Sequence, residues 1–191
     1  MMRKNVTQLV TVAMLSSISY LLMMFDFPFP GLPAFLKIDF SDVPALLAAI
    51  IFGPMAGVIV EGIKNILHYG IQGNLTGVPI GELANFVAGC LFILPVSYFF
   101  RKYRTVKGLT VGLVVGTTLM TLIMSVLNYY IIFPAYTWFL GFPAQSSEQI
   151  RQVVVTGILP FNIIKGAIVA IVFVLLYSRL RVWLESKMQN A

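Results

Sequence analysis

Long apolar stretches alternate with short charged connections along this chain of 191 residues. Four stretches carry no Asp, Glu, Lys or Arg at all, and a fifth carries a single charge. In order, these five stretches are residues 5–25, 43–60, 83–100, 108–147 and 152–178. A helix needs about 20 apolar residues to cross a bilayer. The pattern therefore predicts an all-α integral membrane protein.

Turn signals divide these stretches into elements. Gly53-Pro54 is a helix-breaking pair, so we expect one short helix before it and another after it. Pro134 and Gly141 predict that the fifth helix ends near residue 133 and is followed by an interfacial loop. We expect one transmembrane domain over 1–191, with helices at about 6–25, 40–52, 54–70, 81–100, 109–133 and 150–178.

The basic residues predict the topology. Nine of the 13 Lys and Arg residues fall in three groups, at the N-terminus, between the fourth and fifth helices, and in the C-terminal tail. They are Arg3, Lys4, Arg101, Lys102, Arg104, Lys107, Arg179, Arg181 and Lys187. Basic loops stay in the cytoplasm. Both termini are then cytoplasmic, and the region 40–70 must cross twice, which gives six helices; a re-entrant hairpin in this region is the alternative.

Composition supports a membrane protein and argues against several functions. Hydrophobic residues make up 59% of the chain and charged residues 10%, against about 25% charged residues in soluble domains. The net charge of +6 comes from clusters between apolar stretches, not from a stripe suited to nucleic acid. The chain has one cysteine, Cys90, and one histidine, His68, with no metal-ligand spacing, nucleophile motif or phosphate-binding loop. We expect no enzyme, and active transport would need an ion gradient or another subunit.

Lys165 is the most informative residue. It lies inside the last apolar stretch, three residues after Asn162 and five after Pro160. A lysine at the centre of a membrane helix costs about 2.5–3.5 kcal/mol on insertion scales, so such residues line polar cavities or meet a partner. Lys165 therefore predicts a functional site in the membrane.

Other polar side chains are expected at a similar depth. Glu82 and Asn85 lie three apart near the outer end of the fourth helix, and Asn128 lies near the outer end of the fifth. With Asn162 and Lys165 they predict an outward-facing pocket. Amides, a cation and nearby rings suit a flat heteroaromatic solute with carbonyls and ring nitrogens. The alternative is that each residue only bonds a neighbouring helix.

Glu61, Lys64, Asn65 and His68 share one face of the third helix. One interpretation is an internal stripe of ion pairs that joins helices. Another is a proton relay through Glu61 and His68. A third is partial participation in a ligand pocket, and all three remain open.

Two further regions carry alternatives. The loop 26–41 contains prolines and aromatic rings, and it is either a lid over the site or an interfacial anchor. On the first helix, Ala13 and Ser17 are small residues four apart, with Ser16 beside them, a pattern that permits close helix packing. They form either an internal packing surface or a docking surface for a second membrane protein.

Four segments carry a family resemblance that covers nearly the whole chain. They run over residues 33–45, 53–65, 79–85 and 160–166, the last reading Pro-Phe-Asn-Ile-Ile-Lys-Gly. With these segments the chain resembles the riboflavin-specific S components of energy-coupling-factor (ECF) vitamin transporters. The resemblance implies six membrane helices, an extracellular loop that closes over one vitamin site, and a bacterial cell membrane location.

The resemblance also implies partners and residue roles. The partners are a transmembrane scaffold subunit and two cytoplasmic ATPases, and riboflavin is a transported substrate, not a cofactor. Asn128, Asn162 and Lys165 would contact the edge of the isoalloxazine ring, and Glu82 and Asn85 the ribityl hydroxyls. Phe35, Leu36 and Asp39 would belong to the lid and the segment beneath it. The family's docking motif is commonly Ala-x-x-x-Ala, whereas this chain has Ala13-x-x-x-Ser17.

We therefore expect a membrane subunit that captures riboflavin from outside and takes it up with an ATP-driven energy-coupling module. The alternative is a self-sufficient, proton-coupled secondary carrier for a small aromatic solute.

Overall fold

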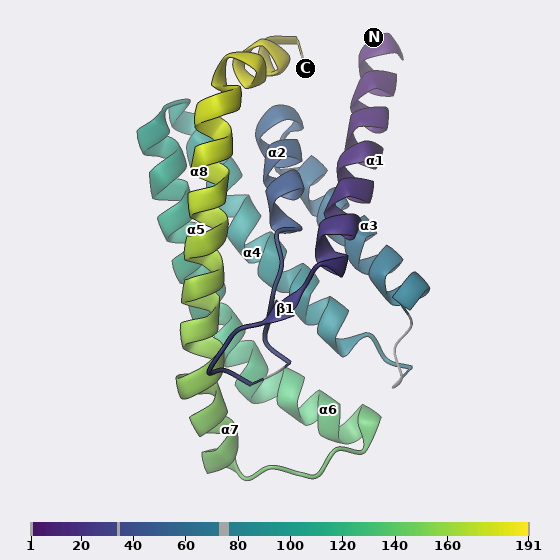
Figure 1. Ribbon diagram of the computed structural model, residues 1–191, viewed down its shortest axis with the longest axis vertical. Coiled ribbons are helices and arrows are strands. Elements are labelled where there is room, and N and C mark those ends of the chain that lie inside the picture. The colour runs from purple at the N-terminus through teal and green to yellow at the C-terminus, as the bar shows by residue number, and fades with distance from the viewer. Residues whose placement is uncertain (1, 34, 73–76, 191) are drawn as a thin grey trace.

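The protein folds into a bundle of helices that stand roughly side by side, with a short β-hairpin crossing it (Figure 1). The computed structural model describes residues 2–33, 35–72 and 77–190, and only the backbone of 2–5 and 183–190. Within these residues the chain forms six continuous helical segments, as the sequence predicts. Four of them are long and apolar enough to cross a membrane: Val6–Met24, Ile80–Tyr103, Val106–Leu140 and Ser147–Val182.

The first four helices are regular. They are α1 (Met2–Met24), α2 (Asp42–Phe52), α3 (Pro54–Gln72) and α4 (Ile80–Tyr103). Between α2 and α3 the chain turns at Gly53, whose φ of 111° is accessible to glycine and strained for other residues. Pro54 then begins α3, a position where its missing N–H is not needed. This single-residue turn lets two short helices occupy a region too short for two full spans.

The last two helical segments each contain a π turn, and here the structure corrects the expected boundaries. The fifth runs through α5 (Val106–Leu127), η1 (Asn128–Ile132) and α6 (Phe133–Leu140). The sixth runs through α7 (Ser147–Val153), η2 (Val154–Ile158) and α8 (Leu159–Asn190). The fifth helix therefore does not end near residue 133 but continues to Leu140, where Gly141 caps it with a φ of 66°.

The π turns explain how both helices tolerate a proline. Pro134 and Pro160 are each the second residue after a π turn. Just before them, Phe133 donates to the carbonyl of Asn128 and Leu159 donates to that of Val154, five residues back. A proline ring collides with the carbonyl four residues earlier in a regular α-helix. The wider turn makes room for the ring, so the helix continues past the proline.

Residues 25–41 connect α1 to α2 through a β-hairpin. Strand β1 (Phe27–Pro28) pairs antiparallel with β2 (Lys37–Ile38), and the Lys37 ammonium lies 2.9 Å from Asp26. The apolar side of the hairpin, with Leu36 and Ile38, packs against Ile158 and Phe161 of the last helical segment. The hairpin is thus held against the bundle by its own buried side chains.

The two ends of the bundle differ. The N-terminus, the C-terminus and the α4–α5 connection lie at one end, and α6 and α7 lie at the other (Figure 1). The described basic residues of the α4–α5 connection, Arg101 to Lys107, mark the first of these, which we call the basic end. The hairpin lies toward the opposite end.

Close approach of α4 and α5 generates a stability prediction. A methyl group added at Gly116 would lie 2.6 Å from the backbone carbonyl oxygen of Phe92, which cannot move aside without shifting α4. We expect Gly116→Ala to lower the free energy of unfolding by about 1–3 kcal/mol, the usual cost of overpacking. Thermal unfolding of the purified protein in detergent measures this loss.

Gly70→Ala is the matched control. Gly70 also lies in a helix, and nothing lies within 4 Å of the added methyl group. Alanine is favoured over glycine in a helix by about 1 kcal/mol, so this variant should be unchanged or slightly more stable. Equal destabilisation by the two substitutions would contradict the packing described for α4 and α5.

Candidate functional site

A large cavity opens between the hairpin, the end of α3, the start of α4 and the two π turns. Its volume is about 790 Å³, within the range of about 300–1,000 Å³ typical of small-molecule sites. All eight residues that the sequence nominates for substrate binding line it. They are Phe35, Leu36, Asp39, Glu82, Asn85, Asn128, Asn162 and Lys165.

Aromatic side chains form much of the apolar wall. Tyr136 and Phe142 stack with ring centroids 5.7 Å apart, and Phe35 of the hairpin meets the edge of Phe133 at 6.4 Å. Phe161 adds a further ring from α8. Walls of this kind favour a flat ring system that can lie between them.

Lys165 has two acidic partners from a distant part of the chain. Its ammonium lies 3.2 Å from Asp39 Oδ2 and 3.6 Å from Asp42 Oδ2. All three side chains are almost fully buried. Asp39 directly follows β2, so this ion pair joins the hairpin to α8 at the floor of the cavity.

A second buried lysine extends this cluster. The Lys64 ammonium lies 2.6 Å from Asp42 Oδ1 and 2.8 Å from Glu61 Oε2, and donates to Ser41 Oγ at 2.7 Å. Ser41 in turn donates to Asp39 through both its hydroxyl and its backbone N–H. We call Asp39, Asp42, Glu61, Lys64 and Lys165 the buried charge cluster. It links α2, α3 and α8 to the hairpin, which supports the ion-pair interpretation of Glu61 and Lys64.

The charge cluster also changes the role expected of Asp39. One of its carboxylate oxygens accepts from Ser41 and the other contacts Lys165. Although Asp39 lines the cavity, its carboxylate is therefore already engaged. Asp39 therefore positions Lys165 relative to the end of β2, and its carboxylate has little capacity left to bind a ligand.

Glu82 and Asn85 present unused acceptors at the other side of the cavity. Glu82 Oε1 lies 3.3 Å from His68 Nδ1, but Glu82 Oε2 has no hydrogen-bond partner among the described residues. Asn85 Oδ1 is also buried without a partner in the described chain. Leaving a buried acceptor without a donor costs about 1–3 kcal/mol of free energy. Both oxygens can therefore accept a hydrogen bond from a ligand or from water.

The Asn128 and Asn162 side chains each make one hydrogen bond to the carbonyl four residues earlier in their own helical segment. Asn128 begins η1 and donates to the carbonyl of Met124, and Asn162 in α8 donates to the carbonyl of Ile158. Each amide keeps its carbonyl oxygen and a second N–H for other partners. They bring matched donors and acceptors from two different helices to one cavity.

The structure places further residues in the cavity. His68 lines it and contacts Glu82, which favours the alternative that this side chain takes part in a ligand pocket. Tyr136, Trp138 and Phe142 also line the cavity, from a region expected to be an interfacial loop. Only the run of aromatics between Phe133 and Phe142 could have indicated them.

The nominated docking residues on α1 divide between two faces. Ala13 and Ser17 are exposed along one side of α1, whereas Ser16 is buried and donates to the carbonyl of Val12. Since α1 packs against α2 and α3, Ser16 faces the bundle. We therefore leave Ser16 out of any docking surface. Among the described residues no group of His, Cys, Asp or Glu could hold a metal ion.

The chain matches a known protein family. The sequence model of the family described as "ECF transporter, substrate-specific component" matches residues 7–177. The chain is 56% identical over 183 residues to "Riboflavin transporter FmnP" of Bacillus subtilis (strain 168), covering 96% of each protein. It is 43% identical over 178 residues to "Riboflavin transporter RibU" of Staphylococcus aureus (strain TCH60), covering 93% of this chain and 92% of that one.

A solved structure is similar over most of its length. It is described as "Structure and mechanism of the S component of a bacterial ECF transporter", and it superposes with a TM-score of 0.80 at 42% sequence identity. The match covers 94% of this chain and 98% of the other. The fold and the family assignment therefore agree.

The buried charge cluster generates a second prediction. Lys64→Met leaves Asp42 and Glu61 buried without their shared cation, and removal of one partner from a buried ion pair costs about 3–5 kcal/mol. Lys37→Met makes the same substitution in a half-exposed pair with Asp26, which we expect to cost less than about 1 kcal/mol. Unfolding in detergent measures both, and equal losses would contradict a structural role of the cluster.

Proposed function

We propose that this chain, which belongs to the family of substrate-specific components of ECF transporters, binds riboflavin in the cavity and takes part in its uptake. The proposal rests on one observation: a cavity walled by aromatic rings holds three asparagine amides and a buried cation, and two of its acceptor oxygens have no partner among the described residues. The relatives named riboflavin transporters support it.

The flavin ring suits the apolar part of the cavity. Its flat, three-ring face can lie against the aromatic walls, and its polar edge offers carbonyl oxygens and ring nitrogens. Asn128 and Asn162 can pair with that edge, since an amide both donates and accepts. The Lys165 ammonium, held by Asp39, adds a donor to a carbonyl oxygen or ring nitrogen.

The ribityl chain suits the opposite side. Its hydroxyl groups are donors, and Glu82 Oε2 and Asn85 Oδ1 are buried acceptors at the cavity that lack a donor among the described residues. Satisfying both removes the cost of leaving them unpaired. A ligand with a ring at one end and hydroxyls at the other therefore complements both halves of the cavity.

The hairpin would act as the lid. Phe35 and Leu36 contribute to the cavity wall, and the Lys37–Asp26 and Lys165–Asp39 pairs hold the two strands of the hairpin and the residue that follows them. We propose that a ring bound beside Phe35 stabilises this segment in the closed position. The cavity would then be sealed from the outer side.

Orientation follows from charge. The basic end would face the cytoplasm with both termini, and the hairpin would face outward. The chain has no phosphate-binding loop of its own. Its membership of the ECF family suggests that energy would come from two cytoplasmic ATPases acting through a membrane scaffold subunit. The exposed side of α1 that carries Ala13 and Ser17 would be the surface that the scaffold contacts.

A direct test is the absorbance of the purified chain between about 350 and 500 nm, where flavins absorb. We expect a bound flavin in the wild type, and an affinity about 10–100-fold weaker in Asn128→Ala and Lys165→Ala. That range is the effect of losing a hydrogen bond to a buried or charged group. Quenching of riboflavin fluorescence on titration gives the dissociation constants.

Thr118→Ala is the matched control, because Thr118 is exposed, lies on the same helical segment as Asn128, and its hydroxyl donates to the backbone carbonyl of Val114 one turn earlier. It should bind like the wild type. If Lys165→Ala does not fold, Asn128→Ala and Glu82→Ala still decide the result. A colourless wild type that leaves added riboflavin fluorescence unchanged would overturn the proposal.

The docking surface is tested by added bulk. Ala13→Phe should abolish ATP-dependent riboflavin uptake in liposomes that contain the whole transporter, with riboflavin binding unchanged, because a large ring prevents close helix contact. Ile18→Phe places the same ring on a different exposed side of α1 and should leave uptake intact. Uptake by the isolated chain, driven by a pH gradient without ATPases, would instead favour the proton-coupled carrier.

A further inference from the structure

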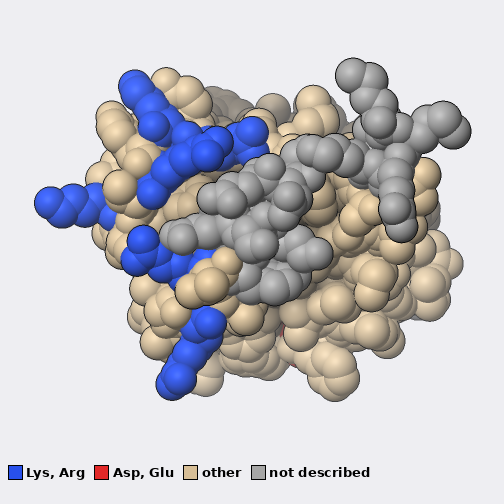
Figure 2. Space-filling model, turned by 90° about the horizontal axis from the view of Figure 1, so that it is seen from above, with Lys and Arg blue, Asp and Glu red and all other residues tan. Residues whose placement is uncertain are grey.

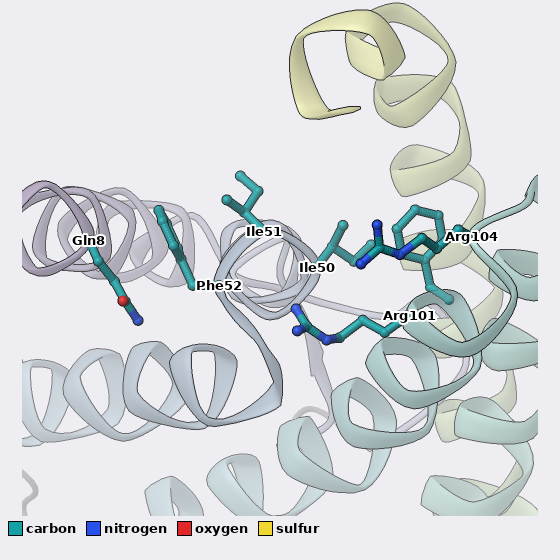
Figure 3. Close-up of a pocket in the computed structure, with 7 residues that line it drawn as sticks. Gln8, Ile50, Ile51, Phe52, Arg101 and Arg104 are labelled. Carbon is teal, nitrogen blue, oxygen red and sulfur yellow. The ribbon is translucent and has the colours of Figure 1, made fainter. Parts of the chain in front are cut away.

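A second, smaller cavity lies at the basic end, away from the proposed riboflavin site. Its volume is about 170 Å³, and α1, α2 and α4 supply its walls (Figure 3). Seven residues line it: Gln8, Ile50, Ile51, Phe52, Phe100, Arg101 and Arg104. Neither the proposed uptake of riboflavin nor the charge cluster uses any of them.

The polar residues of this cavity are all hydrogen-bond donors that suit an anion. Arg101 and Arg104 both extend toward the end of α2 near Ile50, and Gln8 adds an amide from α1 (Figure 3). None of the seven lining residues is acidic. In the described part of the chain, no carboxylate lies within ion-pair distance of either guanidinium. Two neighbouring cations without an acidic partner favour binding of an anion.

The local backbone places Arg101 but does not neutralise it. A methyl group added at Gly53 would lie 3.7 Å from Arg101 Nη1, so this guanidinium lies beside the turn that ends α2. The carbonyl end of a helix carries about half a negative charge and attracts a cation. A partial charge of this size attracts the guanidinium but offsets only part of the charge of the two arginines.

The rest of the wall is apolar. Ile50, Ile51 and Phe100 are buried, and Phe52 is half-buried beside them. A freely dissolved anion gains nothing from these side chains. An amphiphile, with a charged group next to hydrocarbon, uses both parts of the cavity.

We propose that this cavity binds the phosphate group of an anionic phospholipid from the leaflet at the basic end. Guanidinium groups bind phosphate oxygens in pairs, and basic pockets between membrane helices are known to bind such headgroups. The volume suits a phosphate group and the first part of a glycerol backbone. Lys and Arg side chains gather on one side of this face, which would raise the local concentration of anionic lipid (Figure 2).

The test compares two double variants that remove the same charge. Arg101→Gln/Arg104→Gln changes the cavity, whereas Lys102→Gln/Lys107→Gln changes the same loop outside it. The Lys102 ammonium instead lies 5.8 Å from the Tyr98 ring centroid and 5.5 Å from that of Tyr103. Native mass spectrometry of the whole chain in detergent, titrated with phosphatidylglycerol, measures lipid binding. Phosphatidylcholine with the same acyl chains is the uncharged comparison.

We expect the wild type and the lysine variant to bind phosphatidylglycerol within about twofold of each other and to prefer it over phosphatidylcholine. The arginine variant should bind it about tenfold more weakly and lose the preference, since charge-assisted hydrogen bonds are lost. Gln8→Leu, which keeps the charge, should weaken binding by about threefold. If the arginine variant does not fold, Gln8→Leu decides the result.

Four outcomes would overturn the proposal. Equal weakening in both double variants would mean attraction by bulk charge without a specific cavity. Unchanged binding in the arginine variant would exclude the cavity altogether. If inorganic phosphate raises the unfolding temperature as much as phosphatidylglycerol does, the ligand is a free anion. If the arginine variant binds lipid normally but assembles poorly with the scaffold, the cavity binds an acidic protein partner.

Discussion

The rest of the structure depends on the need to pair five charged side chains inside a membrane protein. Asp39, Asp42, Glu61, Lys64 and Lys165 are all buried, and their ion pairs join α2, α3, α8 and the end of the hairpin. Charges without partners would be far more costly in this setting than in a soluble protein. The cluster therefore fixes the position of Lys165, and with it the floor of the cavity, before any ligand arrives.

The two π turns have a complementary role at the cavity wall. Each allows a membrane helix to continue past a proline, and the two turns lie close together beside the hairpin. Asn128 begins the first turn, and Asn162 follows the second by four residues. A regular helix would present these amides at other angles. Local irregularity here serves the site, as is common for π turns near functional residues.

The sequence predicted the helical membrane class, the division of the region 40–70 into two helices at Gly53, and the polar residues that line the cavity. These depend on local signals, namely hydropathy, turn residues and rare polar groups in apolar stretches. The partners of Lys165 could not be predicted, because Asp39 lies 126 residues earlier and no local pattern joins them. The predicted end of the fifth helix is wrong for a physical reason: proline commonly terminates a helix, whereas a π turn accommodates Pro134 here.

We propose that one cavity recognises both the ring and the side chain of the flavin. The most direct measurement is the binding of riboflavin and of lumiflavin, which lacks the ribityl hydroxyls, to the wild type and to Glu82→Ala/Asn85→Ala. We predict that the wild type binds riboflavin more tightly than lumiflavin and that the variant binds the two equally. The variant lacks the two acceptor oxygens that would bind the ribityl hydroxyls. Equal affinity of the wild type for both compounds, or no affinity for either, would contradict it.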